Sequence, residues 1–362
     1  MPAQKEKIFL HSLNLIPELT FEKKQKLLDK FGSFEKAWQA KSQELEDLFI
    51  RSKENLNKFL SIRDKIDPKD EFKKLGSREI LFILKDEEEY PQELRETPWP
   101  PLGLYVKGNI SRESGVRFKC AIVGTRRTTA YGKDMAAKFS EALSKAGVIV
   151  VSGLAMGIDA AAHSGTLNSS TPTWAILGSG VGKIYPKANL YLAKNILRQG
   201  GAIISEYPPD WEAREWNFPE RNRIVAGLSR LTIVVEAPEK SGALITARLA
   251  LEAGREVGVV PSDLTRESAK GSNKLMREGA HPLLSPEDAL YILGLAPEAQ
   301  IPRLDNLDEI DEAILQCLSE PKSGEEILAE TKLKPEIISV KLMELELKNI
   351  ISQRSGEWAR KI

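Results

Sequence analysis

The sequence predicts an α/β protein with a doubly wound, Rossmann-like parallel sheet, flanked by a smaller helical region on either side. Short apolar, β-branched runs recur in the middle of the chain, and three of them end at a glycine with an arginine or a small polar residue beside it. Helical patterns lie between these runs. Buried strands of a parallel sheet have this composition, and helices form the crossovers between them. The length of 362 residues is typical of two or three domains.

Residues 1–75 are expected to form an N-terminal helical domain. Apolar residues recur there at helical spacing, and Gly32 followed by Ser33 is typical of one helix ending and a capped helix beginning. Such a bundle resembles the helix-hairpin-helix and SAM-like domains that accompany DNA-binding proteins. A packing domain without a ligand is the alternative, and the sequence leaves both open.

Residues 76–115 are expected to connect this domain to the sheet. Four prolines between residues 91 and 101 exclude a long helix and favour extended chain. The apolar run Leu104–Gly108 that follows is expected to be an edge strand of the sheet.

Residues 116–295 are expected to form the Rossmann-like core. Strands are expected at 119–123, 148–152, 173–177, 201–205, 231–236 and 256–260. Helices are expected between them, among others at 132–146, 187–199 and 242–254. Strands that alternate with helices in this way predict a doubly wound sheet.

Residues 305–362 are expected to form a winged-helix domain. One helix is expected from Asp308 to Ser319, a second after the capping box that begins at Ser323, and a third from Pro335. Two short runs near the end are expected to pair as a hairpin. The third helix is rich in glutamate, so contact with a protein and contact with DNA both remain open.

Composition places the chain among soluble cytoplasmic proteins. Its apolar fraction is 41% and its charged fraction 29%, and no apolar run approaches the ~18 residues that span a bilayer. The N-terminus has no signal-peptide pattern, so no membrane association is expected. The two cysteines are far apart and the three histidines do not cluster with them, so neither a disulfide nor a metal site is expected.

The strand ends in the core carry the strongest functional signal. Glycine there lets backbone N–H groups approach an anion, and helix N-termini favour negative charge. Residues 116–290 hold 22 lysines and arginines against 17 aspartates and glutamates, and several of these cations follow the strands directly. Cations spread over many strand ends form a track, which suits a polyanion better than a small ligand. The residues predicted to bind it are Gly124, Thr125, Arg126, Arg127, Ser152, Gly153, Gly178, Gly180, Lys183, Lys187, Arg221, Asn222, Arg223, Lys240, Ser241, Gly242 and Thr246.

A cofactor-dependent enzyme is disfavoured. The turn after the first core strand lacks the glycine spacing of a dinucleotide site, and no phosphate-binding loop of the ATPase type occurs. Asp159, Glu206 and Glu236 stand near strand ends, where carboxylates can act as acids or bases. The interpretation we favour is that they hold neighbouring arginines and loops in place. We expect no catalytic residues and no cofactor.

Six motifs in order resemble the DNA-processing protein A (DprA, also called Smf) family. They are Ile122–Arg126, Ser152–Asp159, Ile184–Pro186, Ser205–Pro208, Phe218–Arg223 and Ser241–Ala247. The resemblance implies a core that binds single-stranded DNA, forms a homodimer and loads the recombinase RecA during natural transformation. It also implies that Arg126 and Lys187 contact DNA.

Two alternatives remain open. Phosphoribohydrolases of the lysine-decarboxylase-like type share this fold, but they have a glutamate where this chain has Arg248. At the level of one residue, Arg126 either binds phosphate or pairs with a carboxylate such as Glu206 and only stiffens its loop.

Overall fold

The structure, a computed structural model, describes residues 2–49, 53–110, 118–167, 169–295, 308–318, 320–347, 350–354 and 356–360. The chain divides into two compact units, Met1–Gly294 and Leu295–Ile362. The division predicted from the sequence, with boundaries at residues 75/76, 115/116 and 295–305, remains a proposal. Residues 111–117 and 296–307, where the last two boundaries fall, lie outside the described residues.

The first unit contains a mixed sheet of nine strands among its described residues, in the order β1-β2-β6-β5-β4-β3-β7-β8-β9. The neighbours from β6 to β9 in this order are all parallel, whereas β2 is antiparallel to both β1 and β6. The strands are β1 (Leu81–Leu84), β2 (Gly103–Gly108), β3 (Lys119–Val123), β4 (Ile149–Ser152), β5 (Trp174–Leu177), β6 (Ala202–Ser205), β7 (Leu231–Val234), β8 (Glu256–Val259) and β9 (His281–Pro282). The expected large, mostly parallel sheet is confirmed, and each of the six core strands lies within its expected range.

The expectation of an edge strand at Leu104–Gly108 is wrong. The strand β2 lies between β1 and β6, with Tyr105 opposite Phe82 on one side and opposite Ser205 on the other. The short strand β1, which the sequence analysis did not identify, takes the edge position. It is followed by one turn of helix, α7 (Gln92–Arg95), in the proline-rich segment.

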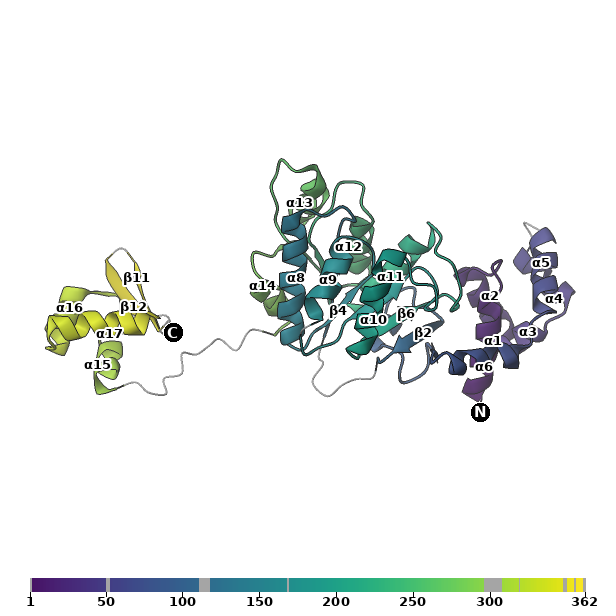
Figure 1. Ribbon diagram of the computed structural model, residues 1–362, viewed down its shortest axis with the longest axis horizontal. Helices are drawn as coiled ribbons and strands as arrows, with labels where there is room; N and C mark the ends of the chain where they lie inside the picture. Colours follow the sequence, from purple (N-terminus) through teal and green to yellow (C-terminus); the bar gives the residue numbers. More distant parts are fainter. Residues whose placement is uncertain are drawn as a thin grey trace. The chain divides into compact units, whose positions relative to one another are not determined.

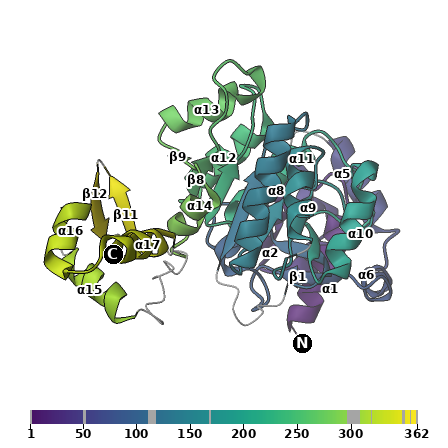
Figure 2. The ribbon, with the colours of Figure 1, turned by 60° about the vertical axis from the view of Figure 1, so that its left-hand side comes forward.

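Helices cover both faces of the sheet. Alternate residues of a strand point to opposite faces, and Ala121 and Val123 of β3 belong to the apolar cluster beneath α11 and α12. The helices α8 and α9 lie side by side against β3 and β4 (Figures 1 and 2). The helices of the core are α8 (Ala130–Lys145), α9 (Ile158–Thr166), η2 (Lys187–Asn189), α10 (Leu190–Arg198), α11 (Asn217–Leu228), α12 (Gly242–Glu252), η3 (Glu267–Ala269), α13 (Lys270–Arg277) and α14 (Pro286–Ile292).

The N-terminal helices share an apolar core with the sheet. Leu10 and Phe59 belong to the same buried cluster as Tyr105 and Leu177, and the ring of His11 lies 2.8 Å from the Tyr105 hydroxyl. The expected helix boundary is confirmed, because Gly32 has a left-handed φ of 72° and Ser33 caps the next helix. The helices are α1 (Pro2–Asn14), α2 (Phe21–Phe31), α3 (Phe34–Gln39), α4 (Ser42–Leu45), η1 (Glu46–Phe49), α5 (Lys53–Arg63) and α6 (Pro68–Ser77).

The second unit has its own apolar core, which includes Ile314, Ile327 and Leu345. Its sheet has the order β10-β12-β11 and is antiparallel. The capping box at Ser323, the helix start at Pro335 and the hairpin are confirmed. The elements are α15 (Glu309–Cys317), β10 (Lys322–Ser323), α16 (Gly324–Thr331), α17 (Pro335–Leu347), β11 (Ile351–Arg354) and β12 (Glu357–Arg360). The winged-helix assignment itself remains a prediction. Within the described ranges, no helix of either unit is long and apolar enough to cross a bilayer.

Candidate nucleic-acid interface

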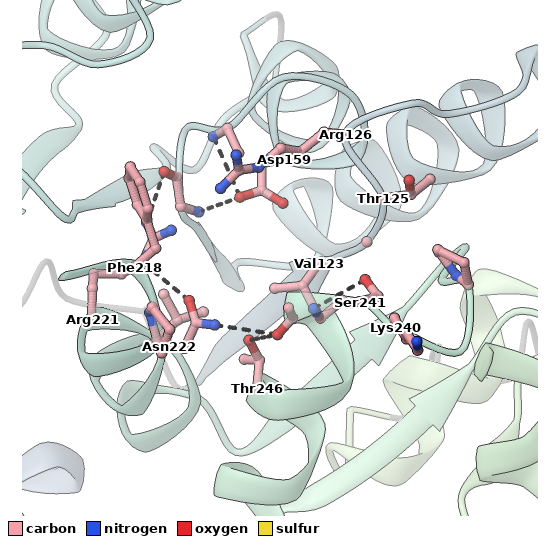
Figure 3. A pocket seen from close by; sticks show the side chains of 18 of the residues that line it. Val123, Thr125, Arg126, Asp159, Phe218, Arg221, Asn222, Lys240, Ser241 and Thr246 are labelled. Atoms are coloured by element: carbon pink, nitrogen blue, oxygen red, sulfur yellow. Dashed lines mark hydrogen bonds between the residues drawn. The ribbon is translucent and has the colours of Figure 1, made fainter. Parts of the chain in front are cut away.

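A cavity of about 600 Å³ lies beyond the carboxyl ends of the central parallel strands. The strand β3 has β4 on one side and β7 on the other, so the chain winds in opposite directions from this point, where open α/β sheets bind their ligands. Eleven of the seventeen residues predicted to bind a polyanion line the cavity. They are Gly124, Thr125, Arg126, Arg127, Gly153, Arg221, Asn222, Lys240, Ser241, Gly242 and Thr246. Figure 3 shows this wall, with Arg126 and Asp159 on one side and Asn222, Ser241 and Thr246 on another.

The turn after β3 is held rigidly by its backbone. A side chain at Gly124 would collide with Ile158 and with the carbonyl group of Glu236. The Thr125 N–H donates to that same carbonyl oxygen at 2.7 Å, and the Thr125 hydroxyl accepts from the Arg127 N–H at 3.2 Å. The turn therefore projects the side chains of Arg126 and Arg127, both exposed, from a fixed base.

Arg126 lies over an aromatic ring and forms no ion pair among the described residues, although its charge opposes the rise that burial causes in the pKa of Asp159. Its guanidinium carbon lies 5.2 Å from the centroid of the Phe218 ring, a distance at which cation and ring attract each other. Glu206, the partner considered from the sequence, instead pairs with Arg223 at 2.5 Å. The positive charge of Arg126 thus remains available to a ligand.

Arg221 turns inward. It is buried, and one of its terminal nitrogens donates to the carbonyl oxygens of Gly153, at 2.7 Å, and Ile176. A Cβ at position 153 would collide with this guanidinium, which explains the glycine there. Arg221 therefore joins the ends of β4 and β5 to α11.

Asp159 is buried near Arg221 and accepts hydrogen bonds from the N–H groups of Gly153, at 3.1 Å, and Ala155, at 3.4 Å. Burial raises the pKa of the Asp159 carboxyl, and the charge of Arg221 opposes that rise. Burial also disfavours the charged form of Arg221 and so lowers its pKa, and the negative charge of Asp159 opposes this lowering. The two side chains form a charged floor beneath the cavity.

Arg223, the other arginine of the same motif, does not line the cavity. Besides its pair with Glu206, it donates to the carbonyl oxygen of Trp99 at 2.9 Å, and its guanidinium carbon lies 5.3 Å from the Phe21 ring. Only 15% of the Arg223 side chain and 11% of the Glu206 side chain are exposed. Arg223 thus ties α11 to the N-terminal helices.

The start of α12 forms the opposite wall. Ser241 caps the helix by accepting from the Ala243 N–H at 3.3 Å, and the neighbouring side chain of Lys240 is exposed. Asn222 donates to the Gly242 carbonyl at 3.2 Å, which joins α11 to α12. A helix N-terminus beside an exposed lysine is suited to phosphate oxygens.

Glu236 serves the fold. It is 1% exposed and accepts from the Thr129 N–H at 3.0 Å and from the Thr128 hydroxyl at 3.1 Å, and the Ser268 hydroxyl also donates to it. A carboxylate at the N-terminus of α8 is stabilised by these donors. This arrangement favours the supporting role over the acid that a hydrolase requires.

The other predicted residues lie outside the cavity lining. Ser152 is buried and donates to the Ile122 carbonyl at 2.6 Å. Gly178 and Gly180 follow β5, where Gly178 accepts from Asn217 at 2.9 Å and Gly180 donates to the Trp211 carbonyl at 2.9 Å. Lys183 and Lys187 are exposed on the segment that follows.

Two aromatic residues in the cavity wall, Tyr185 and Phe218, were not predicted as site residues. Their ring centroids lie 5.7 Å apart, and Tyr185 is 48% exposed. Both belong to motifs recognised in the sequence, but only the structure shows that they meet beside Arg126. Aromatic rings next to cations are the usual platform for unstacked bases.

Comparison with known proteins places the chain in a defined group. A family model described as DNA recombination-mediator protein A matches residues 81–294. Protein Smf of Synechocystis is 34% identical over 92% of this chain and 93% of its own length. DNA processing protein DprA of Bacillus subtilis is 42% identical over 55% of this chain and 67% of its own.

Two solved structures agree with this placement. The X-ray structure of DNA processing protein A from Streptococcus pneumoniae is 31% identical and covers 79% of this chain and 97% of its own, with a TM-score of 0.66. DNA processing protein A from Helicobacter pylori, described for its single-stranded DNA binding mode, is also 31% identical. It covers 59% of this chain and 95% of its own, with a TM-score of 0.53.

Proposed function

The chain belongs to the DNA recombination-mediator protein A family, and from this premise we propose that it binds single-stranded DNA in the cavity beyond β3. The observation that carries the proposal is the meeting of three exposed cations with two aromatic rings in one cavity. Arg126, Arg127 and Lys240 supply the charges, and Tyr185 and Phe218 supply the rings.

This combination suits a flexible strand without regard to sequence. Guanidinium groups bind phosphate oxygens through paired hydrogen bonds, and aromatic side chains stack on any base because every base has a π-face. The first N–H groups of α12 add donors for a further phosphate. A duplex hides the faces of its bases, so we expect single strands to bind more tightly than duplexes.

Within this proposal the two arginines of α11 have a supporting role. Arg221 holds the cavity wall and Arg223 ties α11 to the N-terminal helices. The exposed cations, which we propose bind the DNA backbone, are Arg126, Arg127, Lys183, Lys187 and Lys240. Of the seven cations predicted from the sequence, this proposal therefore assigns DNA contact only to the five that are exposed.

The family resemblance supports a further set of proposals. We propose that the protein acts in the cytoplasm without catalysing a reaction, as a homodimer that protects incoming single strands and loads RecA on them during natural transformation or DNA uptake. The winged-helix assignment of the second unit is part of this proposal.

The experiment that tests DNA binding is a titration with single- and double-stranded oligonucleotides of one sequence over a range of salt concentrations. The logarithm of the affinity for the single strand should fall with log salt by roughly 0.7 per phosphate contact. A single-strand affinity that is absent, or that salt leaves unchanged, contradicts the proposal. RecA loading is tested separately, by filament formation on strands covered with a single-strand-binding protein.

A further inference from the structure

The segment that leaves the cavity through Tyr185 is strongly cationic. Residues 183–200 contain four lysines and arginines and no aspartate or glutamate. By contrast, the loop between β6 and α11 contains Glu206, Asp210, Glu212 and Glu215, with Arg214 as its cation. A polyanion leaving the cavity is therefore attracted toward the first segment rather than toward the second.

Three of the four cations of this segment form, together with a tyrosine, a stripe along one face of η2 and α10. Lys187, Tyr191, Lys194 and Arg198 follow one another at intervals of four, three and four residues, which places them on one side of a helix. The opposite face packs into the core through Ala193 and Ile196. We call these four residues the α10 stripe.

The α10 stripe is free to meet a ligand. All four residues are exposed, and Tyr191 is 71% exposed. Within the described part of the chain none of its cations forms an ion pair, and Arg198 has only a 3.5 Å contact with the Asn195 side chain. An exposed tyrosine between unpaired cations is the pattern expected of a surface that stacks bases and neutralises phosphates.

The stripe begins at the cavity itself. Tyr185, two residues before it, lines the cavity and contacts Phe218. Asn189 is buried and donates to the carbonyl oxygens of Leu154, at 2.9 Å, and Ala155, at 3.2 Å. Ala155 also lines the cavity, so these bonds anchor the start of α10 to the cavity wall.

We propose that the α10 stripe is a second part of the DNA site, which holds the strand after it leaves the cavity. The inference rests on the proposed function, and it adds Tyr191, Lys194 and Arg198 to the site. With a rise of 1.5 Å per residue, the stripe from Lys187 to Arg198 is about 16 Å long. At about 3.4 Å per stacked nucleotide, it accommodates roughly four or five nucleotides.

The test compares oligothymidylates of increasing length, bound to the full chain. A variant with Tyr191→Ala, Lys194→Ala and Arg198→Ala should bind oligomers of about four nucleotides as the wild type does. For oligomers of about twelve nucleotides or more it should bind at least about tenfold more weakly, because one stacking platform and two phosphate contacts are lost. Its salt slope on long oligomers should be shallower by about 1.4.

Two further variants make the result specific. Tyr191→Phe should bind long oligomers nearly as the wild type does, whereas Tyr191→Ala alone should not, because stacking needs the ring and not the hydroxyl. A matched control, Lys26→Ala with Lys36→Ala, removes two exposed lysines from α2 and α3, outside the stripe and the cavity lining. It should leave binding at every length unchanged.

The outcomes separate this inference from the proposed function. If the wild type does not bind any oligomer, whatever its length, the proposed function itself fails. If the wild type binds short and long oligomers but the triple variant matches it at every length, the inference is overturned while the cavity site stands. A triple variant that binds DNA normally but no longer supports RecA filament formation would instead show that α10 is a protein-docking surface.

Discussion

The turn after β3 and the first two turns of α11 are both rich in arginine, yet they use it in opposite ways. Arg126 and Arg127 are exposed on a rigid turn, and neither forms an ion pair within the described part of the chain. Arg221 and Arg223 are enclosed by carbonyl oxygens and by Glu206. A guanidinium that already has partners inside the protein cannot give the same donors to DNA. The comparison therefore separates the arginines that we propose bind DNA from the arginines that support the fold.

The largest effect on folding is expected from Arg221→Ala. The substitution leaves the carbonyl oxygens of Gly153 and Ile176 without their donor. It also leaves Asp159 buried without the nearby positive charge of Arg221, and an uncompensated buried charge costs about 3–5 kcal/mol. Urea denaturation measures the loss. The double variant Arg221→Met with Asp159→Asn should lose less than Arg221→Ala, because no unpaired charge stays buried. An Arg221→Ala variant as stable as the wild type would show that Arg221 does not support the fold.

Arg223→Ala is expected to have the next largest effect, about 2 kcal/mol of unfolding free energy, since it removes charge-assisted hydrogen bonds to Glu206 and Trp99. The salt slope of single-strand binding should stay at the wild-type value, because the side chain does not line the cavity. Both quantities are measured on the same preparation. A shallower salt slope with unchanged stability would show that Arg223 contacts DNA.

The pH dependence of folding stability near Arg221 provides a third test. Burial, aided by the charge of Arg221, lowers the pKa of His163 to about 3. Below its unfolded pKa of ~6.5 the unfolded chain binds a proton that the folded chain does not, so the stability contributed by neutral His163 is complete above pH 6.5 and is lost as the pH falls toward 3. The loss at pH 5 is about 2 kcal/mol.

Urea denaturation at pH 7 and pH 5 measures this loss of unfolding free energy. His163→Asn is expected to be less stable than the wild type at pH 7 but to lose about 2 kcal/mol less between the two pH values. His11, whose pKa burial lowers to about 4, remains in both proteins and contributes equally to both. Equal losses in the wild type and the variant would contradict the assignment to His163.

Arg126→Ala is expected to change folding least, by about 0–1 kcal/mol, because the side chain is exposed. Its effect is on DNA: affinity for every single strand should fall alike, and the salt slope should become shallower by about 0.7. Arg126→Lys should recover only part of the affinity, since an ammonium group lacks the paired donors of a guanidinium. A melting temperature lowered by several degrees with affinity intact would make Arg126 structural.

Prediction from sequence succeeded where the cause is local. The six core strands follow from short β-branched runs, and the cap at Gly32 and Ser33 follows from residues next to each other in the chain. The location of the cavity was also predictable, because carboxyl ends of parallel strands meet at one edge of a sheet. The α10 stripe is visible in the sequence as a cationic run of helical spacing, although its connection to the cavity is not.

The sequence by itself therefore determined the six core strands, the edge of the sheet at which the cavity lies, and the cations and glycines found there. Tertiary structure alone decided which arginines are exposed at the cavity and which have partners inside the protein. Arg221 meets carbonyl groups 45 and 68 residues away along the chain, and Arg223 meets a glutamate 17 residues away. It also moved Leu104–Gly108 from the edge to the interior by placing β1 beside it. The physical reason is that a charged side chain or a strand edge takes its role from the groups that surround it, and those groups come from distant parts of the chain.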